Sequence, residues 1–154
     1  MCPAAAPPSV TGMRTWKLGL PLWAIAVLGL LAAPRVVLHD LGLIHEGTFV
    51  NALLVFVPLV IWVTVAVASS TKPFLSMLAT GGGYGLCLAI GHLLLADIPP
   101  LGGELAGRLS PVLEQLLTRG AIVVSSLVTG VVVGAVCGLV AWGIGRLTRR
   151  SAVT

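Results

Sequence analysis

Residues 121–147 read AIVVSSLVTGVVVGAVCGLVAWGIGRL, an apolar run of helical length that contains no acidic residue. Small residues recur in it every four positions, at Ser126, Gly130, Gly134 and Gly138. Because residues four apart share one face of a helix, this spacing predicts a row of small side chains that lets a second helix approach closely within a membrane. We therefore expect this segment to cross the bilayer and to pack tightly.

Three further apolar runs precede this segment, at about residues 16–38, 49–68 and 74–96. A helix needs roughly 20 apolar residues to cross a bilayer, so each run is a candidate span. The composition agrees, since 57% of the 154 residues are hydrophobic, 9% are charged and the mean hydropathy is +1.07. The sequence thus predicts an all-α, polytopic integral membrane protein with a bundle of four transmembrane helices, and it excludes a water-soluble domain.

The chain divides into one membrane domain and two short tails. Residues 1–12 are rich in Pro and Ala and carry no charge, which is typical of disorder. The expected organisation is a disordered N-terminal tail at 1–15, a four-helix transmembrane domain at 16–147 and a basic cytoplasmic tail at 148–154. Arg14 and Lys17 follow Met13 as in a signal anchor, so translation from Met1 and from Met13 are both open.

The first apolar run is interrupted by Pro34, which is followed at once by Arg35. Either the helix kinks at the proline and continues, or the chain from Arg35 onward lies in the membrane interface. A cleaved signal peptide ending near residues 31–33 is a third alternative, which the adjacent proline disfavours.

Charged residues separate by sign between the two sides of the predicted bundle. Six of the nine basic residues fall on one side: Arg14, Lys17, Lys72, Arg146, Arg149 and Arg150. The acidic residues fall on the other: Asp40, Glu46, Asp97, Glu104 and Glu114. Because Lys and Arg in short loops stay on the cytoplasmic side, we expect both termini to lie in the cytoplasm. The membrane is expected to be the plasma membrane. The net charge is +4, but the basic residues form no patch beyond the membrane boundary that could bind nucleic acid.

The third apolar run carries its own row of small residues, at Gly81, Gly85 and Ala89. Consecutive elements usually pack together, so the third and fourth helices are predicted to meet through their two rows. A homodimer, or a membrane protein partner bound through the fourth helix, is the alternative use of the same face.

A short additional helix is predicted in the loop before the fourth span. Ser110 and Pro111 form a good helix start. Apolar and polar residues then alternate with helical periodicity, which is typical of a helix lying in the membrane interface. We expect this short outer helix to be separate from the span at 121–147.

Ionisable residues concentrate at the predicted outer face. This outer polar cluster comprises Arg35, His39, Asp40, His45, Glu46, His92 and Asp97. It contains every histidine of the chain. It is the candidate functional site, because the apolar runs hold no acidic residue that could act as a buried relay.

Three kinds of chemistry suit these residue types. A network of hydrogen bonds closing the helix ends is the simplest, and His beside an acid would also let it respond to pH. His39, His45 and His92 are candidate metal ligands, although their spacing matches no metal motif. Two histidines on different helices could also hold haem. The sequence leaves the cofactor unknown, and the absence of a cofactor is the leading expectation.

No catalytic signature occurs in the chain, so enzymatic activity is not expected. The predicted function is that of an accessory, assembly or regulatory membrane component. The alternative is a transporter for a small solute, protons or a metal ion, which requires a polar path through the bundle. The side chains available for such a path near mid-membrane are Thr64, Ser76, Thr80, Ser125, Ser126 and Thr129.

Overall fold

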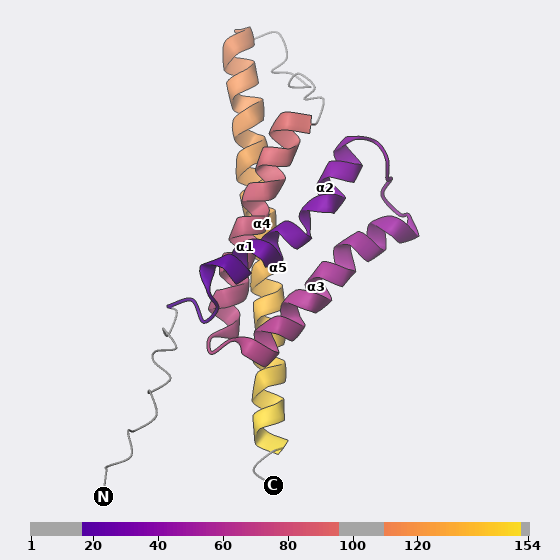
Figure 1. Ribbon diagram of the computed structural model, residues 1–154. Helices are drawn as coiled ribbons and strands as arrows, with labels where there is room; N and C mark the ends of the chain where they lie inside the picture. Colours follow the sequence, from indigo (N-terminus) through magenta and orange to yellow (C-terminus); the bar gives the residue numbers. More distant parts are fainter. Residues whose placement is uncertain (1–16, 96–109, 152–154) are drawn as a thin grey trace, which may run out of the picture.

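The computed structural model describes residues 17–95 and 110–151. Within these ranges the helices are α1 (Leu22–Leu31), α2 (Ala33–Asp40), α3 (Phe49–Ser69), α4 (Pro73–Leu95) and α5 (Pro111–Ser151) (Figure 1). The α1–α2 pair, α3, α4 and α5 are each long and apolar enough to cross a membrane. The prediction of an all-helical integral membrane bundle with four spans is confirmed. The predicted tail at residues 1–15 lies outside the described residues.

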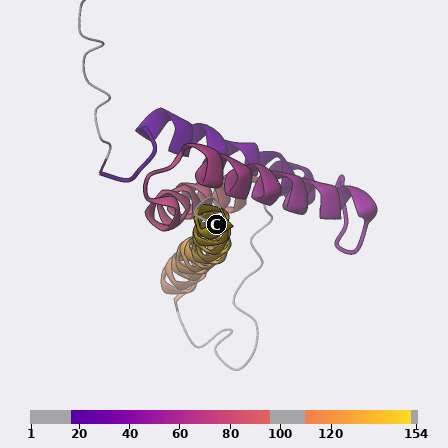
Figure 2. The same ribbon diagram turned by 90° about the horizontal axis from the view of Figure 1, so that it is seen from below.

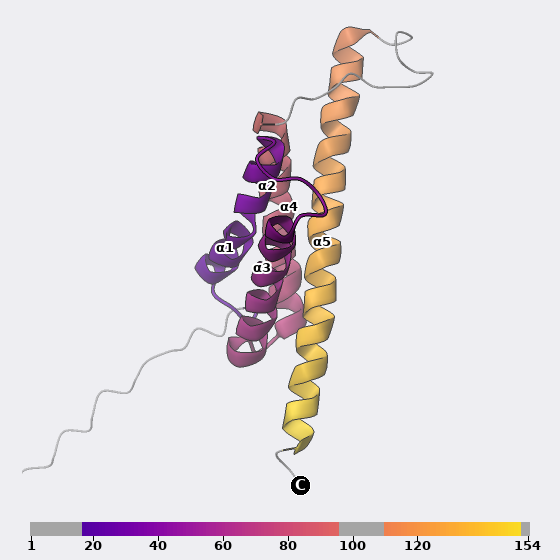
Figure 3. The ribbon, with the colours of Figure 1, turned by 90° about the vertical axis from the view of Figure 1, so that its right-hand side faces the viewer.

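Helix α4 is the centre of the bundle and contacts each of the other helices. Its most extensive contact is with α5, which lies on one side of it, while α1 and α2 lie on the other (Figure 3). The α1–α2 pair and α3 run side by side as a layer (Figure 2). Helix α3 is inclined, so that its C-terminal half lies near α5 and its N-terminal half lies well to the side (Figure 1).

Helices α4 and α5 approach each other backbone to backbone. A Cβ atom added at Gly81 would collide with the backbone of Gly130 and Gly134, and one added at Gly85 would lie 2.8 Å from the carbonyl oxygen of Ser126. Real Cβ atoms do not come this close to backbone, so glycine is required at these positions. Each predicted small-residue position is buried: Gly81, Gly85, Ala89, Ser126, Gly130, Gly134 and Gly138.

The first span is broken at Ala32, between α1 and α2. Pro34 lacks an N–H group and its ring conflicts with the carbonyl four residues earlier, so a regular helix cannot run through it. The break falls two residues before the proline, and the amide of Ala32 donates to Gly29 three residues back, at 3.3 Å. The chain kinks and continues as a helix, which is the first of the alternatives considered for this run.

A side chain from α3 satisfies a carbonyl that this break frees. The Trp62 indole N–H donates to the carbonyl oxygen of Leu28 at 2.7 Å, and Trp62 is fully buried. Its ring also packs edge-on against Tyr84 of α4, with centroids 5.8 Å apart. Since an unpaired carbonyl is costly in a membrane, this tryptophan holds the kinked first span against the rest of the bundle.

The segment before α1 is attached to the turn between α3 and α4. Ser76 donates to the carbonyl of Leu18 at 2.6 Å, and its hydroxyl lies 2.6 Å from that of Ser70. Gly19 has a φ of +86°, and a Cβ there would lie 2.7 Å from the Ser70 hydroxyl. The left-handed backbone and the lack of space both require glycine at this point.

The segment beginning at Pro111 is helical, as expected, but it is not a separate interfacial helix. It forms the first turns of α5, which continues without a break from Pro111 to Ser151. Gly120 is the residue best suited to end a helix in this segment. The helix continues through it because a glycine within a helix costs only about 1 kcal/mol relative to alanine. Helix α5 also extends beyond the expected end at residue 147, through Arg149, into the predicted tail.

Candidate functional site

Helix α2 ends at Asp40 in a turn that fixes its last side chains. Gly42 has a φ of +69°. Its amide donates to the carbonyl of His39 at 2.9 Å, and the amide of Leu43 donates to the carbonyl of Leu38 at 2.9 Å. This pair of bonds around a left-handed glycine is the Schellman motif, a common helix terminus. His39 and Asp40 therefore lie on a well-defined last turn.

His92 lies in the last turn of α4, opposite the end of α2. The preceding residue is Gly91, and a Cβ there would lie 2.8 Å from a methyl carbon of Val36. Helix α2 can approach α4 this closely because residue 91 has no side chain. As a result, His92 Nδ1 lies 2.8 Å from Asp40 Oδ2. We call His39, Asp40 and His92 the His–Asp–His cluster.

The carboxyl group of Asp40 is the buried member of this cluster. Its side chain is 4% exposed, compared with 37% for His39 and 33% for His92. Asp40 Oδ1 lies 3.5 Å from His39 Nδ1, while His92 approaches Oδ2 at ion-pair distance without the alignment of a hydrogen bond. A carboxylate removed from water needs a partner, and here each oxygen faces an imidazole.

Two other members of the outer polar cluster, His45 and Glu46, lie at the margin of the His–Asp–His cluster. Glu46 Oε1 is 3.9 Å from His39 Nε2, but the Glu46 side chain is 81% exposed and water screens this interaction. His45 is exposed, and its carbonyl accepts a bond from the Thr48 hydroxyl at 2.8 Å. Asp97 lies outside the described residues.

The structure does not bring the three candidate metal ligands together. In the parts of the chain that are described, no group of three or more His, Cys, Asp or Glu residues is placed to hold a metal ion. His39 and His92 approach through Asp40, whereas the exposed His45 side chain makes no hydrogen bond or ion pair with them within those parts.

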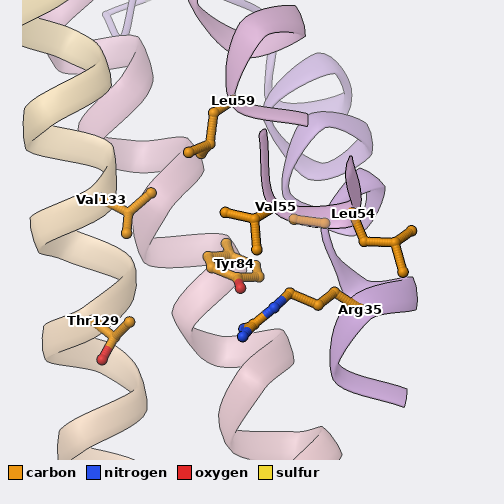
Figure 4. A pocket seen from close by; sticks show the side chains of 8 residues that line it. Arg35, Leu54, Val55, Leu59, Tyr84, Thr129 and Val133 are labelled. Atoms are coloured by element: carbon orange, nitrogen blue, oxygen red, sulfur yellow. The ribbon is translucent and has the colours of Figure 1, made fainter. Parts of the chain in front are cut away.

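Arg35 forms a second polar site, separate from the His–Asp–His cluster. Its Nε–H donates to Asn51 Oδ1 at 3.0 Å, which links α2 to the first turn of α3. Its guanidinium extends toward Tyr84 of α4, close enough to interact with the hydroxyl (Figure 4). Arg35 and Tyr84 line a cavity of about 180 Å³ between the helices. The predicted cluster therefore divides into two sites.

Sequence reasoning did not place Asn51 and Tyr84 in the candidate site. Each is a polar side chain within an otherwise apolar run, and Tyr84 is the one tyrosine of the chain. A polar group in a membrane span needs a partner from another helix, which is the signal that could have found them. The side chain that approaches both of them is Arg35, which the sequence analysis had placed in the outer polar cluster with the histidines.

Comparisons with protein-family models, curated proteins and solved structures found no match to this chain. Function is therefore inferred from side-chain geometry alone.

Proposed function

We propose that this protein is an accessory or regulatory membrane component in which the His–Asp–His cluster couples the packing of α2 on α4 to pH. One observation carries the proposal: His92 Nδ1 on α4 lies 2.8 Å from Oδ2 of Asp40 on α2, and the Asp40 side chain is 4% exposed. Histidine changes its charge between about pH 5 and 8. A single proton on His92 therefore converts this contact into an ion pair between two helices.

The expected effect has a definite sign. The ion pair exists only while the histidine is protonated and Asp40 is ionised, so it contributes on the acidic side of the histidine range and is lost as the pH rises above it. Glu46 Oε1 lies 3.9 Å from His39 Nε2, and Arg35 lies one turn earlier on α2. Because both histidines are about one-third exposed, we expect about 1 kcal/mol rather than the larger effect of a fully buried pair.

The hydroxyl groups near mid-membrane favour this proposal over transport. A transporter needs polar atoms that face a path, yet three of the six hydroxyls, those of Thr64, Thr80 and Ser125, donate to the backbone of their own helix. Thr64 donates to the Val60 carbonyl at 2.8 Å and Thr80 to the Ser76 carbonyl at 2.9 Å. Ser76 itself donates to Leu18 at 2.6 Å. Each such bond uses the one proton of the hydroxyl, so the group can offer a passing solute only its acceptor lone pairs.

The same proposal includes an orientation with both termini in the cytoplasm and the His–Asp–His cluster at the outer face of the plasma membrane. Basic residues gather at the opposite end, where the ammonium group of Lys72 donates to the Lys17 carbonyl at 3.4 Å. The last turns of α5, which carry Arg146 and Arg149, lie at that end too (Figure 1). Such a distribution is typical of a cytoplasmic side. Membrane-impermeant thiol reagents added outside whole cells should label a cysteine at Glu46 and spare one at Lys72.

The test of the pH response measures the distance between α2 and α4 in liposomes. The natural cysteines are replaced, and spin labels are attached at Val37 and Leu94, which are 39% and 77% exposed. We expect the distance distribution to become shorter and narrower when the pH falls from about 7.5 to 5.5. Asp40→Asn should remove this change, because a neutral amide cannot form an ion pair with His92.

Glu46→Gln is the matched control, since it removes an exposed acid near His39 and should leave most of the response. A distance distribution that does not vary with pH in the natural sequence would exclude the proposal, and so would an Asp40→Asn variant that still responds. A proton or solute flux in proteoliposomes that depends on Asp40 would replace the regulatory role with transport.

A further inference from the structure

Arg35 is a charged residue within a membrane span and lacks an opposite charge there. It lies five residues before the end of the first candidate span, which runs from Leu22 to Asp40. In the described ranges no carboxylate comes within ion-pair distance of its guanidinium, because the ion pairs found there involve only the histidines. On insertion scales an arginine costs about 2.5–3.5 kcal/mol at the centre of a membrane helix and less toward its end, unless a counter-charge or water is near.

The hydrogen bonds of Arg35 leave part of the guanidinium open. A guanidinium carries five N–H donors in a planar fork. The bond to Asn51 uses Nε, and the terminal nitrogens extend toward the Tyr84 hydroxyl at the wall of the cavity (Figure 4). Two parallel donors in this arrangement match the two oxygens of a carboxylate or a phosphate.

The cavity has one polar end and several apolar walls. Its volume of about 180 Å³ exceeds that of a single water molecule several-fold. Its polar lining residues are Arg35, Tyr84 and Thr129, and its apolar ones are Ala32, Leu54, Val55, Leu59 and Val133. A cation beside an apolar surface suits a molecule that has both an anionic and an apolar part.

The cavity is only partly enclosed by the protein, so a molecule can enter it from outside the bundle. Its walls combine the N-terminal half of α3, through Leu54 and Val55, with the middle of α5, through Thr129 and Val133. These two helices diverge in this region, because α3 is inclined away from α5 toward its N-terminus (Figure 1).

We propose that this cavity binds the anionic head group of an amphiphile, a carboxylate or a phosphate, with Arg35 as the cationic contact and the apolar walls holding the adjoining hydrocarbon. Tyr84 donates a further hydrogen bond, and Asn51 holds the guanidinium in place through Nε. Either a membrane lipid or a small aliphatic acid from the water phase carries this chemistry. The site is distinct from the His–Asp–His cluster and does not depend on a pH response there.

Binding is measured on the full chain in a neutral detergent. The probes are phosphatidylglycerol against phosphatidylcholine, and octanoate against octanol, each followed by the shift in unfolding temperature and by titration. We expect both the natural chain and Arg146→Gln, which removes an exposed charge elsewhere, to respond to the anionic probes only. Arg35→Gln should bind them at least about tenfold more weakly, as expected for the loss of a charge-assisted hydrogen bond. A response to phosphatidylglycerol alone identifies a lipid as the ligand, a response to octanoate alone identifies a soluble acid, and a response to both shows that the site recognises the anionic group itself.

A second variant keeps the test decisive if Arg35→Gln unfolds. Asn51→Asp places a carboxylate 3.0 Å from the guanidinium and so supplies an internal counter-charge. It should lose the response to anions while its unfolding temperature without added ligand stays equal or rises. Unchanged anion binding in folded Arg35→Gln or in Asn51→Asp would overturn the proposal, as would equal responses of the natural chain to anionic and neutral probes.

Discussion

Adjacent glycines on α4 allow the closest helix contact to be tested with an internal control. An alanine at Gly81 would place its Cβ 2.7 Å from the Cα and 2.8 Å from the nitrogen of Gly134, and in collision with the Gly130 carbonyl. An alanine at Gly82 meets nothing within 4 Å. Both changes have the same effect on helix propensity, about 1 kcal/mol in favour of alanine. The difference between the two variants therefore measures the contact between α4 and α5.

The magnitude follows from the distances. Carbon atoms prefer separations of about 3.5–4.0 Å, so the two helices must move apart by about 1 Å at Gly81. Only backbone atoms are in the way, and no side chain can move aside to relieve the contact. A gap of this size forfeits about a quarter to a half of the local dispersion energy, and overpacking typically costs about 1–3 kcal/mol. We expect Gly81→Ala to be less stable than Gly82→Ala by that amount.

The assay is equilibrium unfolding of both variants in mixed micelles of a mild detergent and dodecyl sulfate, followed by helix content and by tryptophan fluorescence. Trp62 is a suitable probe because it is fully buried and packs on Tyr84 of α4. If the two variants unfold within about 0.5 kcal/mol of each other, the helices are not held at the distance described, and the reasoning fails.

Two further substitutions test single hydrogen bonds. Trp62→Phe removes the donor to the Leu28 carbonyl and should lower the free energy of unfolding by about 1–3 kcal/mol in the same assay. Trp23→Phe is the control: its side chain is 70% exposed, so the free energy of unfolding should change by less than about 0.5 kcal/mol. Thr48→Ala removes the hydroxyl that accepts a hydrogen bond from the Asn51 amide at the start of α3. It should lower the free energy of unfolding by about 1 kcal/mol and speed amide exchange in the first turn, and Thr48→Ser should restore the stability and the slow exchange. Equal exchange in all three chains would contradict the cap.

Much of the architecture could be predicted because hydropathy acts locally. A run of about 20 apolar residues is long enough to span the bilayer as a helix, and a helix satisfies its backbone hydrogen bonds within the one segment. The exact break in the first span could not be predicted in the same way. Pro34 excludes a regular helix, but contacts with other helices determine where the helix breaks. The break falls at Ala32, where the Trp62 indole N–H donates to the freed carbonyl of Leu28.

The end of α2 illustrates why the candidate site was predicted only in outline. The sequence shows His39, Asp40 and His92 at the same end of their helices, but it does not show which side chain is buried. The contact between Val36 and Gly91 decides this, because it brings the two helices together just below the carboxyl group of Asp40. Such a contact between residues distant in sequence has no periodic signal. The same holds for Arg35, which turns toward Asn51 and Tyr84 instead of the histidines.

The kinked first span also constrains the order of assembly during synthesis. The partners of the Leu28 carbonyl and of Asp40 Oδ2 are Trp62 and His92, and both follow later in the chain. At about 5–20 residues per second, roughly 3–10 s separate the appearance of Asp40 from that of His92. Until α4 is synthesised, Asp40 Oδ2 therefore lacks its partner from that helix. Substitution of Trp62 removes one of these two later partners, so we expect it to weaken the attachment of the first span during insertion as well as in the finished bundle.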